Sequence, residues 1–215
     1  MTSAQSEAAR DDRASAAGRL SAEERREQLL DATKRIVATS GFHAVSIEAV
    51  AREAGITRPV VYGHFRDLHG LLEALVEREG SRALGQLAAV LPRDLSGDAP
   101  GELLAAALRG YLEAVQADPV TWRLVLMPPE GAPGVLSEQI ARGRAAVLAQ
   151  IAQAVGPGLV PGRESPDPEL TARTLSTLAD ESARLVLTEP DRYPPERILS
   201  HTRWLLAQMG APPQP

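Results

Sequence analysis

The sequence predicts an all-α fold, and three observations support this prediction. Apolar residues recur at helical spacing along nearly the whole chain, and no segment shows the alternation of a half-buried strand. Breaks rich in glycine and proline separate the periodic segments. We therefore expect a small head of three helices, a connecting helix and a larger helical body. The 215 residues are enough to bury a core, and the chain has no cysteine.

The first helix is expected at 22–39. Ser21 is placed to cap it, and Glu24 to reach back to the capping residue, which makes a capping box. An apolar stripe follows at helical spacing, and Gly41 lies just past the end, where a positive φ is often required.

A helix-turn-helix is expected next. Ser46 caps its first helix, Gly55 provides the sharp turn, and Thr57 caps a short second helix with Pro59 in its first turn. The residues expected to pack these two helices together are Val50, Ile56 and Val61.

A longer helix begins after Asp67 and continues to Leu91. The later helices are expected near 99–116, 119–126, 134–154, 168–188 and 194–209. We divide the chain into a flexible arm at 1–20, a helix-turn-helix head at 21–66, and a larger helical body at 67–211.

Composition narrows the classes of function. The net charge is −5, but residues 1–66 hold 10 basic and 9 acidic residues, so the acidic excess lies in the remainder. No apolar run suggests an exported or membrane-spanning chain, and we expect a cytoplasmic protein. The four histidines lack ligand spacing, and no H-E-x-x-H, P-loop or G-x-S-x-G motif occurs. We expect no metal, no cofactor and no enzyme activity.

Residues 46–72, SIEAVAREAGITRPVVYGHFRDLHGLL, resemble the DNA-binding segment of TetR-type transcriptional regulators. The residues that carry the resemblance are Ser46, Val50, Ala51, Ala54, Gly55, Ile56, Thr57, Tyr62, His64, Phe65 and Leu71. The family usually has a phosphate-binding lysine where this chain has Leu68. Arg66 is a candidate to replace that charge.

The resemblance and the chemistry of the side chains together give a set of candidate DNA contacts. Thr57, Tyr62 and His64 suit phosphate oxygens, while Arg58 suits the O6 and N7 atoms of guanine. The remaining candidates are Pro59 and Val60 against a thymine methyl, Gly63 at a close backbone approach, and Ser46 as a cap with an additional phosphate contact. Phe65 is expected in the core beneath the motif and not at the DNA. The alternatives are that Tyr62 and His64 are ordinary surface residues and that Arg58 is a solvated charge.

For the body, the resemblance implies a homodimer built from the last two long helices. The candidate interface residues are Leu175, Leu178, Leu185, Trp204 and Leu205. The alternative is that these apolar stripes form part of the core within one chain. The resemblance also implies a pocket for a small molecule, with Tyr111, Trp122, Arg123, Leu126, Met127 and Glu181 as candidates. Of the neighbouring acids Asp180 and Glu181, one is expected to face inward. Trp122 as plain core is the alternative, and the 128–133 loop is a candidate gate.

The resulting function is a regulator that binds a pseudo-palindromic double-stranded DNA operator and is released by a small molecule. Repression is the favoured direction. A regulator without a small ligand, controlled by a partner or acting as an activator, is the alternative.

Overall fold

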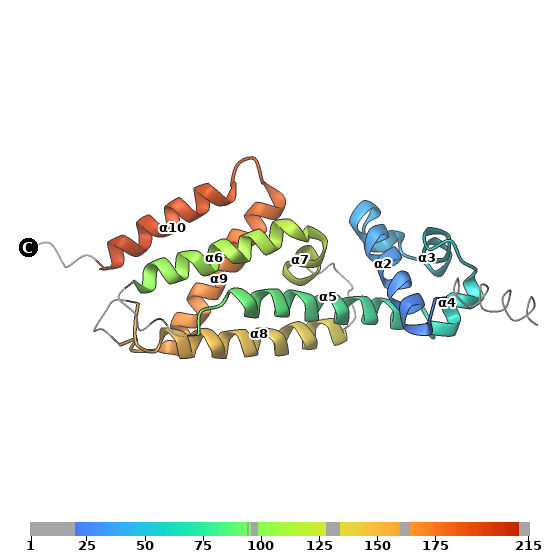
Figure 1. The fold of residues 1–215 in the computed structure, drawn as a ribbon, viewed down its shortest axis with the longest axis horizontal. Helices are drawn as coiled ribbons and strands as arrows, with labels where there is room; N and C mark the ends of the chain where they lie inside the picture. Colours follow the sequence, from blue (N-terminus) through green and yellow to red (C-terminus); the bar gives the residue numbers. More distant parts are fainter. Residues whose placement is uncertain (1–19, 94, 96–98, 128–133, 160–163, 211–215) are drawn as a thin grey trace, which may run out of the picture. The chain divides into compact units, whose positions relative to one another are not determined.

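The computed structural model of the chain describes residues 20–93, 95, 99–127, 134–159 and 164–210, with the side chains of 134–140 and 209–210 left aside. Its regular elements are all helices (Figure 1), which confirms the predicted all-α class. They are α2 (Ala22–Ser40), the 3-10 helix η1 (Phe42–Ala44), α3 (Ile47–Glu53), α4 (Arg58–His64), α5 (Leu68–Val90), α6 (Pro100–Ala117), α7 (Pro119–Leu126), α8 (Gly134–Val155), α9 (Pro168–Thr188) and α10 (Pro195–Gly210).

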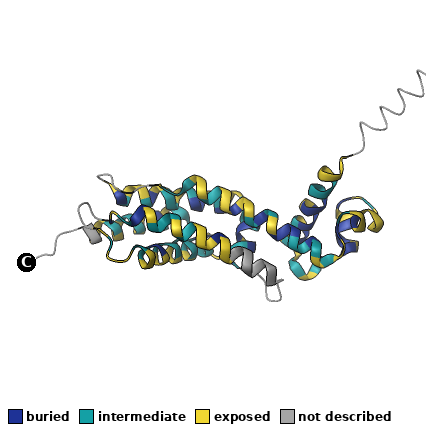
Figure 2. Ribbon diagram, turned by 90° about the horizontal axis from the view of Figure 1, so that it is seen from below, coloured by how far each residue is buried: buried dark blue, intermediate teal, exposed yellow. Residues whose placement is uncertain are grey.

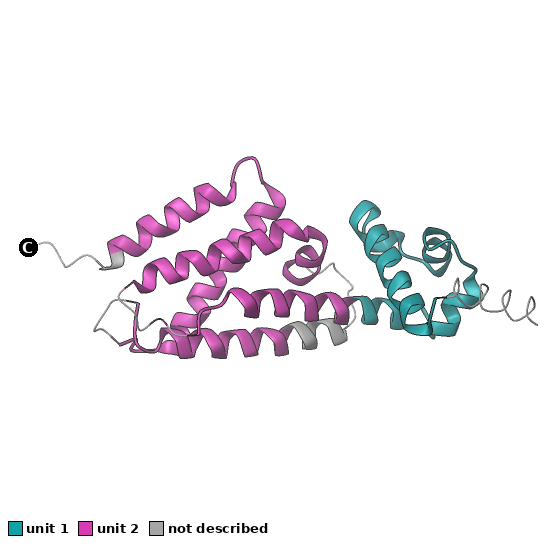
Figure 3. Cartoon of the chain, viewed as in Figure 1, with its two compact units in different colours: residues 1–75 teal, residues 76–215 magenta. Residues whose placement is uncertain are grey.

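The chain divides into two compact units, residues 1–75 and 76–215 (Figure 3). Helix α5 begins in the first unit and ends in the second. The expected arm and the 128–133 loop lie outside the described residues, apart from Leu20.

Side-chain caps set the start of α2, α3 and α5. The Ser21 backbone N–H donates to the Glu24 carboxylate at 2.8 Å, and the Glu24 N–H donates to the Ser21 hydroxyl at 3.2 Å. The Ser46 hydroxyl accepts from the Ala49 N–H at 3.1 Å, and Asp67 accepts from Gly70 at 2.8 Å. These contacts confirm the capping roles expected from the sequence.

The core of the first unit is apolar and closed. Its fully buried members are Leu29, Leu30, Ala32, Val50, Val61, Leu71 and Leu75, all at 0% exposure. Gly55 has φ 68° between α3 and α4, so the turn there uses a backbone conformation that favours glycine. Gly41, at φ 79°, ends α2 in the same way.

In the second unit, α6 packs against α9 and α10, and α8 packs against α9. Figure 2 shows that the buried positions form stripes along these helices, with exposed residues on their outer sides. Two glycines bring helices close together. A Cβ on Gly143 of α8 would lie 2.8 Å from Leu84 of α5, and one on Gly110 of α6 would lie 2.7 Å from Val90.

The expected helices agree with the observed ones to within one or two residues at each end. The short turn η1 was not predicted, and it leaves Phe42 half-buried. None of the helices in the described residues is long and apolar enough to cross a membrane.

Candidate DNA-binding surface and ligand cavity

Helix α4 is the element on which most of the candidate DNA contacts lie. Thr57 is its N-cap residue, but the Thr57 hydroxyl makes no capping hydrogen bond. Pro59 stands in the first turn, where its missing N–H leaves no helical bond unmade. The capping position predicted for Thr57 is therefore confirmed, while its hydroxyl is not used for the cap.

One residue of α4 anchors the helix, and most of the others face outward. Val61 is fully buried, and Phe65, just after the helix, is 5% exposed with the Arg26 guanidinium 5.2 Å above its ring. By contrast, Tyr62 is 49% exposed and Val60 is 38% exposed. The exposed residues in and beside α4 are Thr57, Arg58, Pro59, Val60, Tyr62, Gly63 and Arg66, whereas His64 is half-buried.

Arg58 is held by an acidic neighbour. Its guanidinium lies 2.9 Å from the carboxylate of Glu48 in α3, and both side chains are more than half exposed. Such a pair is easily broken, because exposed ion pairs contribute about 0–1 kcal/mol. Glu48 was not among the candidates from the sequence. Its role depends on the spatial approach of α3 to α4, which no local motif reveals.

Leu68 packs inward, whereas the backbone at Gly63 is open to solvent. Leu68 is half-buried and packs against the apolar core of the first unit, so its position adds no charge to the surface. A Cβ built on Gly63 would meet nothing within 4 Å, which means that the backbone of α4 is uncovered there.

The second unit contains a cavity of about 90 Å³. Five helices contribute to its wall, and most of the lining is apolar. The lining residues are Val76, Gly80, Ala83, Leu84 and Leu87 of α5, Tyr111 of α6, Trp122, Leu124, Val125 and Leu126 of α7, Gly143, Arg144 and Val147 of α8, and Ser176 and Asp180 of α9.

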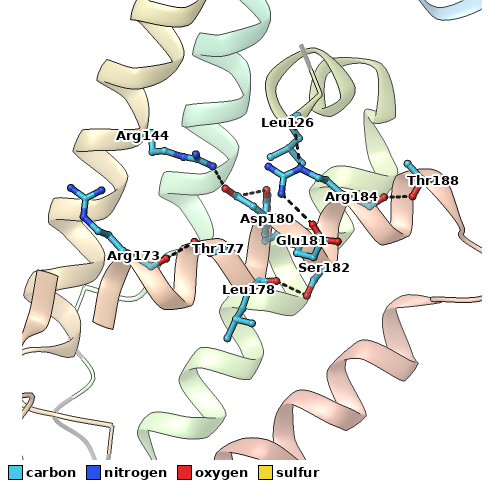
Figure 4. A network of polar contacts seen from close by, with 11 residues as sticks. Leu126, Arg144, Arg173, Thr177, Leu178, Asp180, Glu181, Ser182, Arg184 and Thr188 are labelled. Atoms are coloured by element: carbon cyan, nitrogen blue, oxygen red, sulfur yellow. Dashed lines mark hydrogen bonds and ion pairs between the residues drawn. The ribbon is translucent and has the colours of Figure 1, made fainter. Parts of the chain in front are cut away.

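The polar part of the wall is centred on Asp180. The Tyr111 hydroxyl donates to Asp180 Oδ1 at 3.3 Å, and Arg144 donates to Asp180 Oδ2. Figure 4 shows Arg144 and Asp180 pointing toward one another from α8 and α9. Burial of the phenol, and then the nearby Asp180 carboxylate, raise the pKa of Tyr111 well above its usual value, so this hydroxyl stays a neutral donor.

Trp122 forms the aromatic part of the wall. Its ring meets the Tyr111 ring edge-on, with centroids 4.9 Å apart and planes at 70°. The indole Nε1–H donates to Gln86 Oε1 at 3.0 Å. Trp122 therefore packs in the core, which was the alternative to a role in the ligand pocket, and it also lines the cavity.

The cavity includes three of the six ligand candidates, namely Tyr111, Trp122 and Leu126. The other three lie outside its wall. Arg123 is exposed and donates to the Leu187 carbonyl at 3.0 Å, Met127 packs against the hydrophobic cluster of the unit, and Glu181 lies 3.4 Å from Arg184. Asp180, not Glu181, is the inward acid, because one step along a helix turns the next side chain by about 100°.

Other residues of the cavity wall are not among the candidates predicted from the sequence. Arg144, Gly80 and Gly143 lie on α5 and α8, and nothing in their local sequence distinguishes them from residues on an ordinary helix surface. The weak available signal was the presence of glycines within helices, which often marks a close approach.

A buried polar cluster joins α5 to α7 beside the cavity. Glu79 and Thr121 are both at 0% exposure, and the Thr121 hydroxyl contacts Glu79 and, at 2.8 Å, Asp118. Arg78 lies 2.8 Å from the Glu79 carboxylate, and Arg82 lies 3.4 Å from it. The Glu79 carboxylate thus has polar neighbours on two sides in the interior, and Arg82, whose side chain is 46% exposed, connects the cluster to the surface.

The dimer candidates occupy different environments within the single chain. Leu178, Trp204 and Leu205 are 58%, 56% and 42% exposed, and the Trp204 ring stacks on His201 at 5.5 Å. Leu185 is half-buried, and Leu175 packs against the small cluster of Leu95, Ala154 and Val155. Leu170 of α9, at 60%, adds to the exposed apolar surface.

No group of three or more histidine, cysteine, aspartate or glutamate residues suited to a metal occurs in the described parts of the chain.

Residues 29–75 match the family model of the bacterial regulatory proteins of the tetR family. The HTH-type transcriptional regulator BetI of Vibrio atlanticus (strain LGP32) is 33% identical over 94 residues, which is 44% of this chain and 46% of BetI. The chain thus spans about half the length of this curated relative.

Solved structures share the fold over most of the chain. A TetR-like transcriptional regulator from Rhodococcus sp. RHA1 has a TM-score of 0.68 and 24% identity, covering 89% of this chain and 98% of its own. SmeT in complex with triclosan has a TM-score of 0.66 and 23% identity, with the same two coverages. SmeT is the repressor of the Stenotrophomonas maltophilia multidrug efflux pump SmeDEF.

Proposed function

Because the chain belongs to the TetR family of bacterial regulatory proteins, whose members are transcription regulators and not enzymes, we propose that it represses transcription by binding an operator. The observation that supports this proposal most strongly is that α4 has one buried residue and several exposed ones. One buried residue, Val61, anchors the helix, while Arg58, Val60 and Tyr62 face outward. A helix held in this way is suited to enter the major groove.

The side chains on α4 divide into two roles. Arg58 recognises a guanine through O6 and N7, and Val60 with Pro59 contacts a thymine methyl. Thr57, Tyr62 and His64 bind phosphates, which position the helix without selecting sequence. Arg66 is exposed and supplies the phosphate contact that Leu68 does not make, Ser46 adds one beside its cap, and Gly63 allows the DNA backbone to come close.

The regulator acts as a homodimer in the cytoplasm. The exposed apolar side chains of α9 and α10, above all Leu178 and Trp204, support this proposal because large exposed apolar patches mark interaction surfaces. Two-fold symmetry matches a pseudo-palindromic operator with half-sites about 34 Å apart, one turn of DNA. Leu185 and Leu205 complete the interface, and Leu175 supports it from within the chain.

A small molecule in the cavity of the second unit releases the operator. The complex of SmeT with triclosan supports a ligand role for proteins of this fold. The ligand acts by its different affinities for the DNA-binding and the released conformations, since equal affinities would shift nothing. Tyr111, Trp122 and Leu126 contact the ligand, and Arg123, Met127 and Glu181 lie outside the cavity wall.

Selection from a random DNA library with the purified protein tests the proposal, at a stated salt concentration. The expected result is an enriched site with two-fold symmetry. The double variant Leu178→Asp, Trp204→Asp should sediment as a monomer and lose this site, whereas Glu113→Ala, at an exposed position of α6, should retain it. Enrichment of no sequence would contradict the regulator, and a stable dimer in the double variant would contradict the interface.

A further inference from the structure

The charges on the cavity wall determine which ligands it accepts. Among the described lining residues, the charged ones are Asp180 and Arg144, and they contact each other. The nearby Arg184 is likewise opposed by Glu181, at 3.4 Å, on the outer side of α9. The charges of the described lining residues therefore balance.

The hydrogen bonds of this wall are also largely satisfied. Each oxygen of the Asp180 carboxylate accepts one bond, from Tyr111 and from Arg144. The Trp122 indole donates to Gln86, away from Asp180. What remains for a ligand at this pair is spare acceptor capacity on the Asp180 carboxylate and spare N–H donors on the Arg144 guanidinium, and the Ser176 hydroxyl also lines the cavity.

Both a cation and an anion would bind this cavity at a cost in free energy. A cation would compete with Arg144 for the Asp180 carboxylate, whose side chain is only 13% exposed. An anion would reach Arg144 but would lie against the same carboxylate, whose negative charge would repel it. Removing a charge from water is costly unless a partner compensates it, and here the partner is already taken.

From these contacts we infer that the ligand is an uncharged, mainly apolar molecule with one group that both donates and accepts a hydrogen bond, such as a hydroxyl. Its apolar part lies against Leu84, Trp122 and Leu126, and its hydroxyl lies between Asp180 and Arg144. The Arg144–Asp180 ion pair is thus the element that excludes ions. This statement rests on the ligand role of the cavity proposed above.

Three probes with a common ring test the inference, namely benzyl alcohol, benzylammonium and benzoate. The chain has two tryptophans, and Trp122 lines the cavity, so its indole N–H resonance in a ¹H–¹⁵N spectrum reports binding without DNA. The variant Trp204→Phe assigns the two indole signals. In the wild type, benzyl alcohol should shift the Trp122 signal, and both ions should bind at least about tenfold more weakly.

Two variants should change the preference in opposite directions. Arg144→Gln leaves the Asp180 carboxylate without its cation, so benzylammonium should become the tightest of the three probes. Asp180→Asn leaves the Arg144 guanidinium without its anion, so benzoate should become the tightest. Arg144 is half exposed, so Arg144→Gln should fold even if the substitution at the more buried Asp180 does not.

Two glycines on α5 give a matched control for the location of binding. A Cβ on Gly80 or on Gly85 would meet nothing within 4 Å, but only Gly80 of these two lines the cavity. Gly80→Leu should fill the cavity and abolish the Trp122 shift, whereas Gly85→Leu should bind benzyl alcohol as the wild type does.

The outcomes separate this inference from the proposed regulation. An ion that binds the wild type as tightly as benzyl alcohol would overturn the inference, and so would the absence of any Trp122 shift with the alcohol at millimolar concentration. If the alcohol binds with the expected ranking but leaves operator affinity unchanged, the charge preference stands and the effector role of the cavity fails.

Discussion

The two units of the chain differ in how many polar side chains they bury and in the hydrogen-bond partners of those side chains. In the described part of residues 1–75, the buried polar side chain is Thr33, whose hydroxyl donates to the Leu29 carbonyl one turn earlier, at 2.8 Å. In residues 76–215, Glu79 and Thr121 are buried together, and Tyr111 bonds Asp180 across two helices. The functional polar side chains of the first unit thus lie on its surface, whereas those of the second unit lie in its interior.

This difference fits the two tasks proposed for them. A helix that binds DNA needs a rigid apolar base and exposed polar groups, because DNA itself desolvates them on binding. A ligand cavity needs polar groups that are already oriented in a dry interior. Substitutions should therefore affect the first unit mainly through its surface contacts and its apolar packing. In the second unit they should act through buried polar pairs.

The largest effect is expected from Glu79→Ala. Removing one member of a buried ion pair costs about 3–5 kcal/mol, because the opposite charge loses its partner in the interior. Arg78, whose side chain is 10% exposed, would lose this carboxylate. Both tryptophans lie in the second unit, so the midpoint of urea denaturation followed by tryptophan fluorescence should fall sharply. Glu77→Ala, at an exposed position of the same helix, is the control, and equal midpoints for the two variants would contradict the role of the cluster.

Leu30→Ala should have a similar or slightly smaller effect, confined to the first unit. Leu30 is fully buried, and such a truncation costs about 2–5 kcal/mol through lost burial and the resulting cavity. DNA binding and part of the helicity should be lost at low urea concentration, while the tryptophan transition stays near its wild-type midpoint. Leu20→Ala, at a position that is 44% exposed, should change neither. A tryptophan midpoint that falls together with DNA binding would show that the two units do not unfold separately.

Arg58→Ala should reduce discrimination at one base pair by about 1–3 kcal/mol, since a bidentate contact to guanine is lost. Tyr62→Phe is the comparison, because loss of a phosphate contact weakens binding to all sequences alike. Affinities for the selected operator and for single-base variants of it, measured by fluorescence anisotropy, distinguish the two. If both substitutions weaken all sequences equally, Arg58 does not recognise a base.

The smallest effect is expected from Glu48→Gln, which removes the ion pair with Arg58. Both side chains are exposed, so stability should change by less than about 1 kcal/mol. Loss of a negative charge beside α4 should instead strengthen binding to non-specific DNA by a factor of about two to five at low salt. Glu53→Gln, whose carboxylate pairs with Arg35 at 2.7 Å, is a charge-matched control. Equal changes in both variants would indicate a general charge effect rather than a role for Glu48.

The helices and the turn of the first unit can be predicted from the sequence, whereas the cavity of the second unit cannot. Caps such as Ser21, Ser46 and Asp67, and turns such as Gly55, act within a few residues, so the helix boundaries and the arrangement of α3 and α4 follow from local patterns. The cavity joins residues as far apart as Gly80 and Asp180. No local pattern links them, and the choice between Asp180 and Glu181 depends on which face of α9 packs inward.

Recognition of an operator sequence can be separated from binding to phosphates alone by the ratio of two affinities. The dissociation constants of the full chain for the selected two-fold-symmetric site and for a scrambled site of equal length would be measured at 150 mM salt. We expect a preference of at least about 10³-fold for the symmetric site. A preference below about tenfold, with affinities that fall in parallel as salt rises, would mean that the chain binds phosphates without recognising an operator.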